Sequence, residues 1–298
     1  MKSAIVVSPH LDDAALSCGG GITRLVRAGI PVTVVTMFTA DQPQGVPLSP
    51  LARHALVTWG PSEHLFADRR AEDRAAMSLL GVRFEHLDQL DVVFRRSRAG
   101  APLYQGPMAS PAPDDVEDLL PRLVAALRSS AVGTASEATV FCPIAACGHV
   151  DHTLTRRAVE QVIGSTHLIY YGEYPYYARP DAPGAGVIGP DGWRLHELPL
   201  SADEIEGRVA AIACYKSQLR GLFPSPMERF GTILAQRVPA IGHIWVPKPD
   251  LDASRKRMTA KVIIDTAGIG GERYLWSPES TAPFLAALQG RGLDSGDA

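Results

Sequence analysis

The chain has 298 residues, of which 46% are hydrophobic and 20% charged, and its formal net charge is -3. This composition suits one large globular domain, and so weak a charge gives no electrostatic footprint for nucleic acid or an anionic membrane. No apolar run approaches the roughly 18 residues that a membrane helix needs, and the first apolar run is too short for a signal peptide. We therefore expect a cytoplasmic protein with reduced cysteines, and neither nucleic acid nor membrane as a partner.

Strand and helix patterns alternate through the first 165 residues. The predicted strands are 4–7, 31–39, 83–90, 138–144 and 167–176, and the predicted helices are 14–28, 67–82, 114–130, 152–163 and 203–223. Such alternation is typical of a parallel sheet that is covered on both faces. The sequence therefore predicts an α/β fold, Rossmann-like, with three α/β/α layers and a mostly parallel sheet.

Three segments rich in Gly, Pro and Ser interrupt this pattern, at 40–66, 95–113 and 178–192. We expect them to be loops that form the walls of a pocket, because binding residues concentrate on loops. The basic run within 95–98 is expected to be a solvated charge run. We predict one domain over residues 1–230, with a small C-terminal extension over 231–298 that packs on it.

Two segments crowded with metal-ligating side chains each follow a predicted strand and begin a helix. They are Pro9-His10-Leu11-Asp12-Asp13 and Gly148-His149-Val150-Asp151-His152. Ligands of open parallel sheets bind at the carboxyl ends of the strands. We therefore expect both segments to lie at the same rim of the sheet.

A divalent metal site is the interpretation that these residue types favour. Zinc accepts imidazole nitrogen and carboxylate oxygen, and catalytic sites use three protein ligands. His10 and Asp13 are three apart across a strand-to-helix turn, and His152 supplies a third ligand, which leaves Asp12 beside the metal as a proton acceptor. In the alternative, Asp12 and Asp13 only cap a helix and His149 and His152 are surface residues. The recurrence of the pattern at two matching positions favours the metal site.

The same residues resemble the PIG-L / LmbE-like family of zinc-dependent N-deacetylases. The stretch "SPHLDDAALSCGG" resembles the P-H-P-D-D-E opening of that family, and "GHVDH" resembles its H-x-D-H motif. The stretch "RRAEDRAAMSLLGV" is similar to its R-x-x-E…A…LG-V helix. The resemblance covers about residues 3–230 and extends weakly to 271–276.

The resemblance implies a role for each motif residue. His10, Asp13 and His152 bind Zn²⁺, or Fe²⁺ in its place, since nitrogen and oxygen ligands discriminate these ions weakly. Asp12 is the general base, and His149 is the electrophilic or acidic group, as a cation, at the carbonyl oxygen.

Further residues are expected to support the reaction or to contact the substrate. Asp151 is expected to orient His149. Arg69 and Asp91 lie where relatives contact the sugar, while Glu173 and Tyr174 lie at the end of a predicted strand and are well placed for a ligand. The residues expected to contact the substrate are thus Arg69, Asp91, Glu173 and Tyr174.

The chain departs from the family pattern at three positions. Leu11 replaces a proline, and Ala14 replaces a glutamate that supports the loop. Cys147 stands where one branch has a tyrosine that helps to hold the oxyanion. Either the metal and His149 hold the oxyanion alone, or another tyrosine substitutes. The candidate tyrosines are Tyr174, Tyr176 and Tyr177. Cys147 as a fourth ligand would close the site to water.

The sequence and the resemblance together predict a metal-dependent hydrolase. It would remove an N-acyl group, N-acetyl foremost, from an amino sugar or a glycosylated small molecule, with a metal-activated water and Asp12 as general base. Two alternatives remain open: an amidase that acts on a thiol-conjugate or peptide-like substrate at the same site, and a Mg²⁺-dependent nucleotide- or phosphate-binding module. A homo-oligomer is compatible with each of these three functions.

Overall fold

The computed structural model describes residues 3–60, 64–134, 137–164, 167–174, 194–222 and 272–276. Its strands are β1 (Ser3–Ser8), β2 (Val32–Thr36), β3 (Arg83–His86), β4 (Ala138–Pro143), β5 (Leu168–Tyr171), β6 (Arg194–Leu198) and β7 (Glu272–Trp276). Its helices are α1 (Asp13–Arg27), α2 (Pro50–Trp59), α3 (Leu65–Leu80), α4 (Leu120–Ser129), α5 (Ala131–Thr134), α6 (Val150–Glu160), α7 (Ala202–Ile212) and α8 (Lys216–Leu222). Two shorter helical segments are η1 (Val92–Phe94) and η2 (Asp115–Leu119).

The strands form one sheet in the order β3-β2-β1-β4-β5-β7-β6. The first five of these run parallel to their neighbours. The central strand β1 is a continuous apolar run that is almost fully buried, as expected of a parallel strand covered on both faces. The predicted mostly parallel α/β sheet is confirmed.

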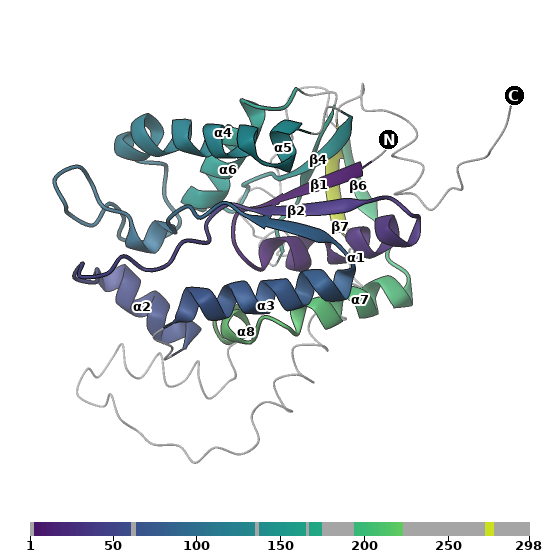
Figure 1. Ribbon diagram of the computed structural model, residues 1–298, viewed down its shortest axis with the longest axis horizontal. Coiled ribbons are helices and arrows are strands. Elements are labelled where there is room, and N and C mark those ends of the chain that lie inside the picture. The colour runs from purple at the N-terminus through teal and green to yellow at the C-terminus, as the bar shows by residue number, and fades with distance from the viewer. Residues whose placement is uncertain are drawn as a thin grey trace, which may run out of the picture.

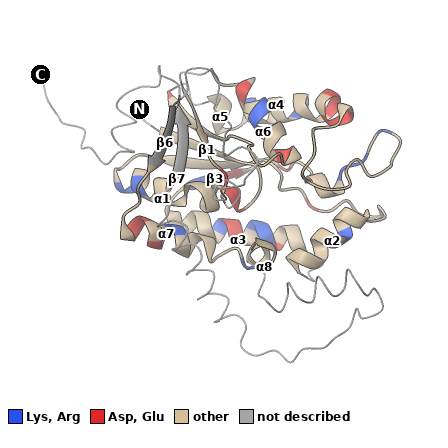
Figure 2. Cartoon of the chain, turned by 180° about the vertical axis from the view of Figure 1, so that it is seen from behind, with Lys and Arg blue, Asp and Glu red and all other residues tan. Residues whose placement is uncertain are grey.

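Helices cover both faces of this sheet. In Figure 1, α4, α5 and α6 lie on one side of it, and α1, α3 and α7 lie on the other. Each helical layer packs against its own set of buried strand side chains, so the sheet separates two apolar clusters. The three-layer α/β/α architecture is therefore confirmed. Acidic and basic residues both lie along α3 (Figure 2). None of the described helices has the length and hydropathy of a membrane span.

The antiparallel edge of the sheet is a feature that the sequence did not predict. Strand β7 pairs antiparallel with both β5 and β6. β7 lies within the segment 231–298, so part of the expected extension contributes to the main sheet. The expected pocket loop at 178–192 lies outside the described residues.

Helix α2 lies within the segment 40–66, which the sequence predicted as a loop. The Ser49 side chain accepts a hydrogen bond from the Ala52 N–H at 2.9 Å, and Pro50 follows in the first turn. A serine N-cap followed by proline is a helix start, because the missing N–H of proline is not needed there. The prediction of a loop was wrong because serine and proline are typical of loops as well as of helix starts.

Two other predicted elements have different bounds. The helix predicted over 203–223 divides into α7 and α8, and tighter backbone bonds from Cys214 to Ala211 and from Tyr215 to Ile212 mark the break. The strand predicted over 83–90 ends earlier, because Asp88 has a φ of 54° that no regular strand allows.

Close packing of α1 against α7 depends on glycine. A Cβ on Gly19 would meet Arg208 Cγ at 3.0 Å, and a Cβ on Gly207 would meet Thr23 Oγ1 at 2.8 Å. The small residues let the two helices approach each other closely.

Candidate metal centre

The turn after β1 brings His10 and Asp13 to one side. The Ser8 hydroxyl donates to the His10 carbonyl at 2.7 Å and accepts from the Ala14 N–H at 3.1 Å. Asp13 Oδ2 accepts from the His10 N–H at 2.9 Å. These bonds close the turn although Ala14 carries no polar side chain, and Asp12 takes the N-cap position of α1.

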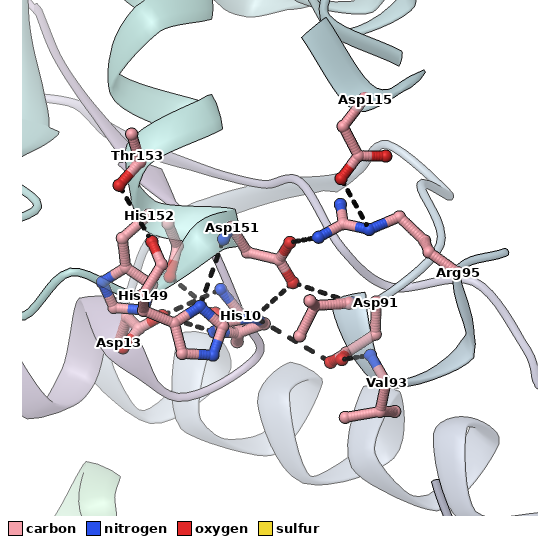
Figure 3. A network of polar contacts seen from close by, with 12 residues as sticks. His10, Asp13, Asp91, Val93, Arg95, Asp115, His149, Asp151, His152 and Thr153 are labelled. Carbon is pink, nitrogen blue, oxygen red and sulfur yellow. Dashed lines mark hydrogen bonds and ion pairs between the residues drawn. The ribbon is translucent and has the colours of Figure 1, made fainter. Parts of the chain in front are cut away.

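The second segment reaches the same rim because β4 pairs with β1. Gly148 has a φ of 73°, which a residue with a side chain rarely adopts, and it turns the chain into α6. His149 is the N-cap residue, and its Nδ1 accepts a hydrogen bond from the Asp151 N–H at 3.1 Å. His152 lies in the first turn of the helix and points toward Asp13 (Figure 3).

The structure brings together the three side chains predicted as metal ligands. Asp13 Oδ2 lies 3.2 Å from His10 Nδ1 and 3.4 Å from His152 Nε2. One ligand atom from each of the three residues lies within 4.8 Å of the other two. Two imidazole nitrogens and one carboxylate oxygen at this spacing are a donor set that a divalent ion accepts, so the residues fit the metal that the sequence suggested.

The outer nitrogens of both histidines contact carboxylates. Asp151 Oδ2 lies 3.0 Å from His10 Nε2 and accepts a hydrogen bond from the Val92 N–H at 3.0 Å. Asp151 also pairs with the guanidinium of Arg95. We expected the Asp151 carboxylate to orient His149. Instead this carboxylate contacts His10, and the hydrogen bond that His149 receives from Asp151 comes from the backbone N–H. A carboxylate oxygen of Asp151 still lies within 4.8 Å of a ring nitrogen of His149.

Glu173 lies behind His152. Its Oε1 is 3.1 Å from His152 Nδ1, and its residue is 1% exposed. It does not line the cavity described below. The expectation that Glu173 contacts the substrate therefore has no support in the geometry, because the side chain turns toward the metal ligand.

His149 differs from its two neighbours in its electrostatics. Burial, together with His10 and His152 nearby, holds the pKa of His149 well below its ordinary value. A lowered pKa favours the neutral ring over the cation that we expected. Because Nδ1 accepts a hydrogen bond, the proton resides on Nε2, which can donate to a substrate oxygen.

Asp12 is set apart from the ligand atoms. It is buried, and burial together with the negative charge of Asp13 raises its pKa to about 6, while Arg69 and His10 oppose that rise. A carboxylate with a raised pKa at the edge of a cavity is a common feature of a general base.

A cavity of about 340 Å³ opens beside the ligand cluster. Its polar end includes Asp12, Arg69, Asp91 and His149, and Tyr174 also lines it. Its other walls come from α1, α2, η1, α8 and the loop at Pro107. The residues that line them are Leu16, Leu51, His54, Ala55, Thr58, Trp59, Val93, Pro107, Gln218, Gly221 and Leu222. Segment 40–66 was expected to form a pocket wall as a loop, and within it α2 forms that wall as a helix.

Arg69 is a buried cation at the polar end of this cavity. Its guanidinium carbon lies 4.4 Å from the centre of the Trp59 ring and 4.9 Å from that of Phe66. The residue is 2% exposed, and its Nε and Nη1 have no hydrogen-bond partner among the described residues. Two unused buried donors that face a cavity are available to a ligand.

The remaining predicted residues have definite places. Asp91 caps η1, and its Oδ2 lies 3.8 Å from His10 Nε2. Cys147 Sγ lies 3.7 Å from His152 Nδ1, which is the outer nitrogen rather than the one that faces Asp13. Tyr176 and Tyr177 lie outside the described residues.

Arg95 is a site residue that the sequence missed. The run at 95–98 was expected to be solvated, but Arg95 is 6% exposed and pairs with Asp151 and with Asp115, the latter at 3.2 Å (Figure 3). Nothing in a short basic run separates a buried arginine from an exposed one. Arg95 is buried because the fold places these two carboxylates around its guanidinium.

The sheet order and the strand-end cluster define an α/β enzyme with two imidazoles and a carboxylate at the ends of its parallel strands. The family described as GlcNAc-PI de-N-acetylase (PIG-L) matches residues 5–163. The 2'-N-acetylparomamine deacetylase of Niallia circulans is 30% identical over 272 residues, which cover 85% of this chain and 94% of that protein. The chain belongs to the PIG-L family and is an N-deacetylase.

Two solved structures of relatives agree with this placement. A deacetylase of the teicoplanin biosynthesis pathway has a TM-score of 0.66 at 25% identity, over 94% of this chain and 100% of that one. A zinc-inhibited form of a teicoplanin deacetylase has a TM-score of 0.66 at 25% identity, over 92% of this chain and 97% of that one.

Proposed function

We propose that this protein is a metal-dependent hydrolase that removes the N-acetyl group from an amino sugar within a small glycosylated molecule. The observation that carries the proposal is the convergence of His10 Nδ1, Asp13 Oδ2 and His152 Nε2 beside a cavity that Asp12 also lines. The relatives support the substrate class, because their names record an N-acetylated aminoglycoside fragment and teicoplanin.

Zn²⁺ is the ion that we propose first, with Fe²⁺ as the alternative. The donor set suits both ions, and the relative solved in a zinc-inhibited form makes the choice of ion worth measuring. A divalent ion bound there supplies a Lewis acid, which polarises the amide carbonyl and lowers the pKa of water to roughly 7.

The protein's own residues would handle the protons. Asp12 would accept the proton of the attacking water at its carboxylate and later deliver it to the departing amine. General acid–base help of this kind contributes roughly 10²–10⁴-fold. His149 would donate its Nε2–H to the carbonyl oxygen as negative charge develops there, a type of stabilisation worth roughly 10²–10³-fold in kcat.

Other cavity residues would hold the sugar. Arg69 offers two unused donors, and Asp91 offers an acceptor beside His10. Tyr174 lines the same cavity. Sugar hydroxyls both donate and accept hydrogen bonds, so a cation and a carboxylate at one end of a cavity suit them.

The test is a panel of N-acetylated amino sugars and aminoglycosides, offered to chelator-treated protein before and after Zn²⁺ or Fe²⁺ is restored. We expect release of acetate and a primary amine only after the metal is restored. Cleavage confined to peptide-like or thiol-conjugate amides would favour the amidase alternative. Metal retention only in the presence of a phosphate compound, with no hydrolysis, would favour the binding module.

A further inference from the structure

Glu173 makes a specific contact with one side of the candidate metal centre. It follows β5 by two residues, and its Oε1 lies 3.1 Å from Nδ1 of His152. The opposite nitrogen of that ring, Nε2, faces Asp13 Oδ2 at 3.4 Å. The imidazole is thus held between a candidate metal position and a buried carboxylate.

The Glu173 carboxylate has few polar contacts among the described residues. Its Oε2 is buried and has no hydrogen-bond partner among the described residues. Its Oε1 also accepts a hydrogen bond from Cys147 Sγ at 3.9 Å. A buried carboxylate is costly unless positive charge compensates it. For Glu173 that charge would come from an ion bound to His152.

Asp151, which holds the other histidine, is different. It accepts hydrogen bonds from the Val92 N–H and pairs with Arg95, so its charge is balanced within the fold. Asp151 therefore has charge-balancing contacts that are independent of a metal, whereas in the part of the chain that the structure describes Glu173 contacts His152 and Cys147. A substitution of Glu173 therefore changes the metal centre with less disturbance of other contacts than a substitution of Asp151.

We propose that Glu173 is a positioning residue of the metal centre, which fixes the ring of His152 and keeps its proton on Nδ1 so that Nε2 faces the ion. The inference rests on the proposed metal site. A histidine that binds a metal usually donates its other N–H to a carboxylate or carbonyl, and loss of that partner costs roughly 10–100-fold in metal affinity or activity. Glu173 then acts through His152 and does not contact the substrate.

A second metal ion is the competing interpretation of the same residues. Cys147, His152 and Glu173 offer three ligand atoms within 4.8 Å of one another. An ion there would require His152 to give up the Nδ1 proton and to bridge two ions. The positioning role needs no such deprotonation, so we favour it and let the metal stoichiometry decide.

The experiment measures the affinity of the full chain for Zn²⁺ by competition with a chelator of known strength. We expect wild-type protein to bind one ion. Glu173→Ala should bind it roughly 10–100-fold more weakly, and Glu173→Gln should lose less, because the amide oxygen still accepts from Nδ1–H. On amide substrates, saturating zinc should restore kcat in Glu173→Gln with an unchanged KM.

Asp73→Asn is the matched control. Asp73 is also buried, and it contacts His86 Nε2 at 2.8 Å and the Tyr215 hydroxyl at 2.7 Å. It is absent from the lining of the metal cavity. We expect this variant to lose stability but to keep the wild-type zinc affinity, which separates a metal-specific effect from general loss of a buried carboxylate.

Several results would overturn the proposal. Unchanged zinc affinity in both Glu173 variants, with a raised KM, would make Glu173 a substrate contact. Two ions in wild type and one in Cys147→Ala would make Cys147, His152 and Glu173 a second metal site. If Glu173→Ala does not fold, the isosteric Glu173→Gln decides. Since affinity needs no substrate, a failure to deacetylate any sugar would refute the proposed function without refuting this one.

Discussion

The ring centres of His10 and His152 lie 5.3 Å apart, although His10 follows β1 by two residues and His152 lies in α6. Both rings turn one nitrogen toward Asp13 Oδ2 and the other toward a separate carboxylate. This double contact defines the position of both rings, which is what a preorganised metal site requires.

Asp12→Asn should separate catalysis from metal binding. Asn is nearly isosteric with Asp but cannot accept the water proton, so we expect kcat to fall by roughly 10²–10⁴-fold while the bound metal stays. Steady-state kinetics and metal analysis on the same preparation check this. Loss of the ion in Asp12→Asn with an intact fold would show that Asp12 is itself a ligand.

His149→Ala should also keep the metal. It removes the Nε2–H donor from the carbonyl oxygen, so kcat should fall by roughly 10²–10³-fold with little change in KM. A metal content below that of wild type would instead assign His149 to the ligand set, together with His10 and Asp151.

Arg69→Met tests the substrate end of the cavity. Met keeps apolar contact with Trp59 but removes the two free donors, and hydrogen bonds to a charged group are worth about 1.5–3 kcal/mol. We expect kcat/KM to fall by roughly 10- to 150-fold, mainly through KM, with the metal retained.

Arg70→Met is the matched control for Arg69. Arg70 is the next residue along α3, but it pairs with Asp41 at 2.8 Å and bonds to the Thr39 carbonyl at 2.6 Å. Its kinetics should equal those of wild type. Equal losses in the two variants would show that α3 rather than the free donors of Arg69 determines the effect.

Glu204→Gln tests the support beneath the site. Glu204 completes a capping box with Ser201 and pairs with Arg24 of α1 at 2.7 Å, and these contacts hold its pKa below the ordinary value of 4.5. Because the pKa of Glu204 is lower in the folded state than in the unfolded chain, its ionised carboxylate stabilises the fold at pH values above the unfolded-state pKa. This stabilisation is lost as the pH falls through the folded-state pKa. We expect a loss of about 1 kcal/mol in unfolding free energy at pH 7, which shrinks below pH 4.5.

Asp203→Asn is the comparison for Glu204→Gln. Asp203 pairs with Arg27 at 3.0 Å, and both side chains are more than half exposed. Exposed pairs contribute little, so urea unfolding should show a smaller loss than Glu204→Gln. A pH-independent loss in Glu204→Gln would show that packing rather than charge is responsible.

Much of the fold could be predicted from local pattern. The apolar residues of α3 recur at helical spacing, and the short apolar run of β1 is typical of a buried parallel strand. The edge strands β6 and β7 could not be predicted in this way, because their pairing joins segments far apart in the chain. The start of α2 was not predicted for a different reason, because Ser49 and Pro50 suit both a loop and a helix N-terminus.

The candidate site shows the same division. His10, Asp13 and His152 could be predicted because strand ends of a parallel sheet converge. The partners of Asp151 and Glu173 could not, because the contacts depend on side-chain directions at the first turn of α6 and after β5. Arg95 is the clearest case, since its neighbours Asp115 and Asp151 come from two other segments.

The most direct test of the account is the metal content of the full chain purified without chelator, compared with that of His152→Ala. We predict one divalent ion per wild-type chain and none in the variant, with circular dichroism unchanged. An ion retained in His152→Ala, or a wild-type chain that deacetylates sugars with no metal bound, would contradict it.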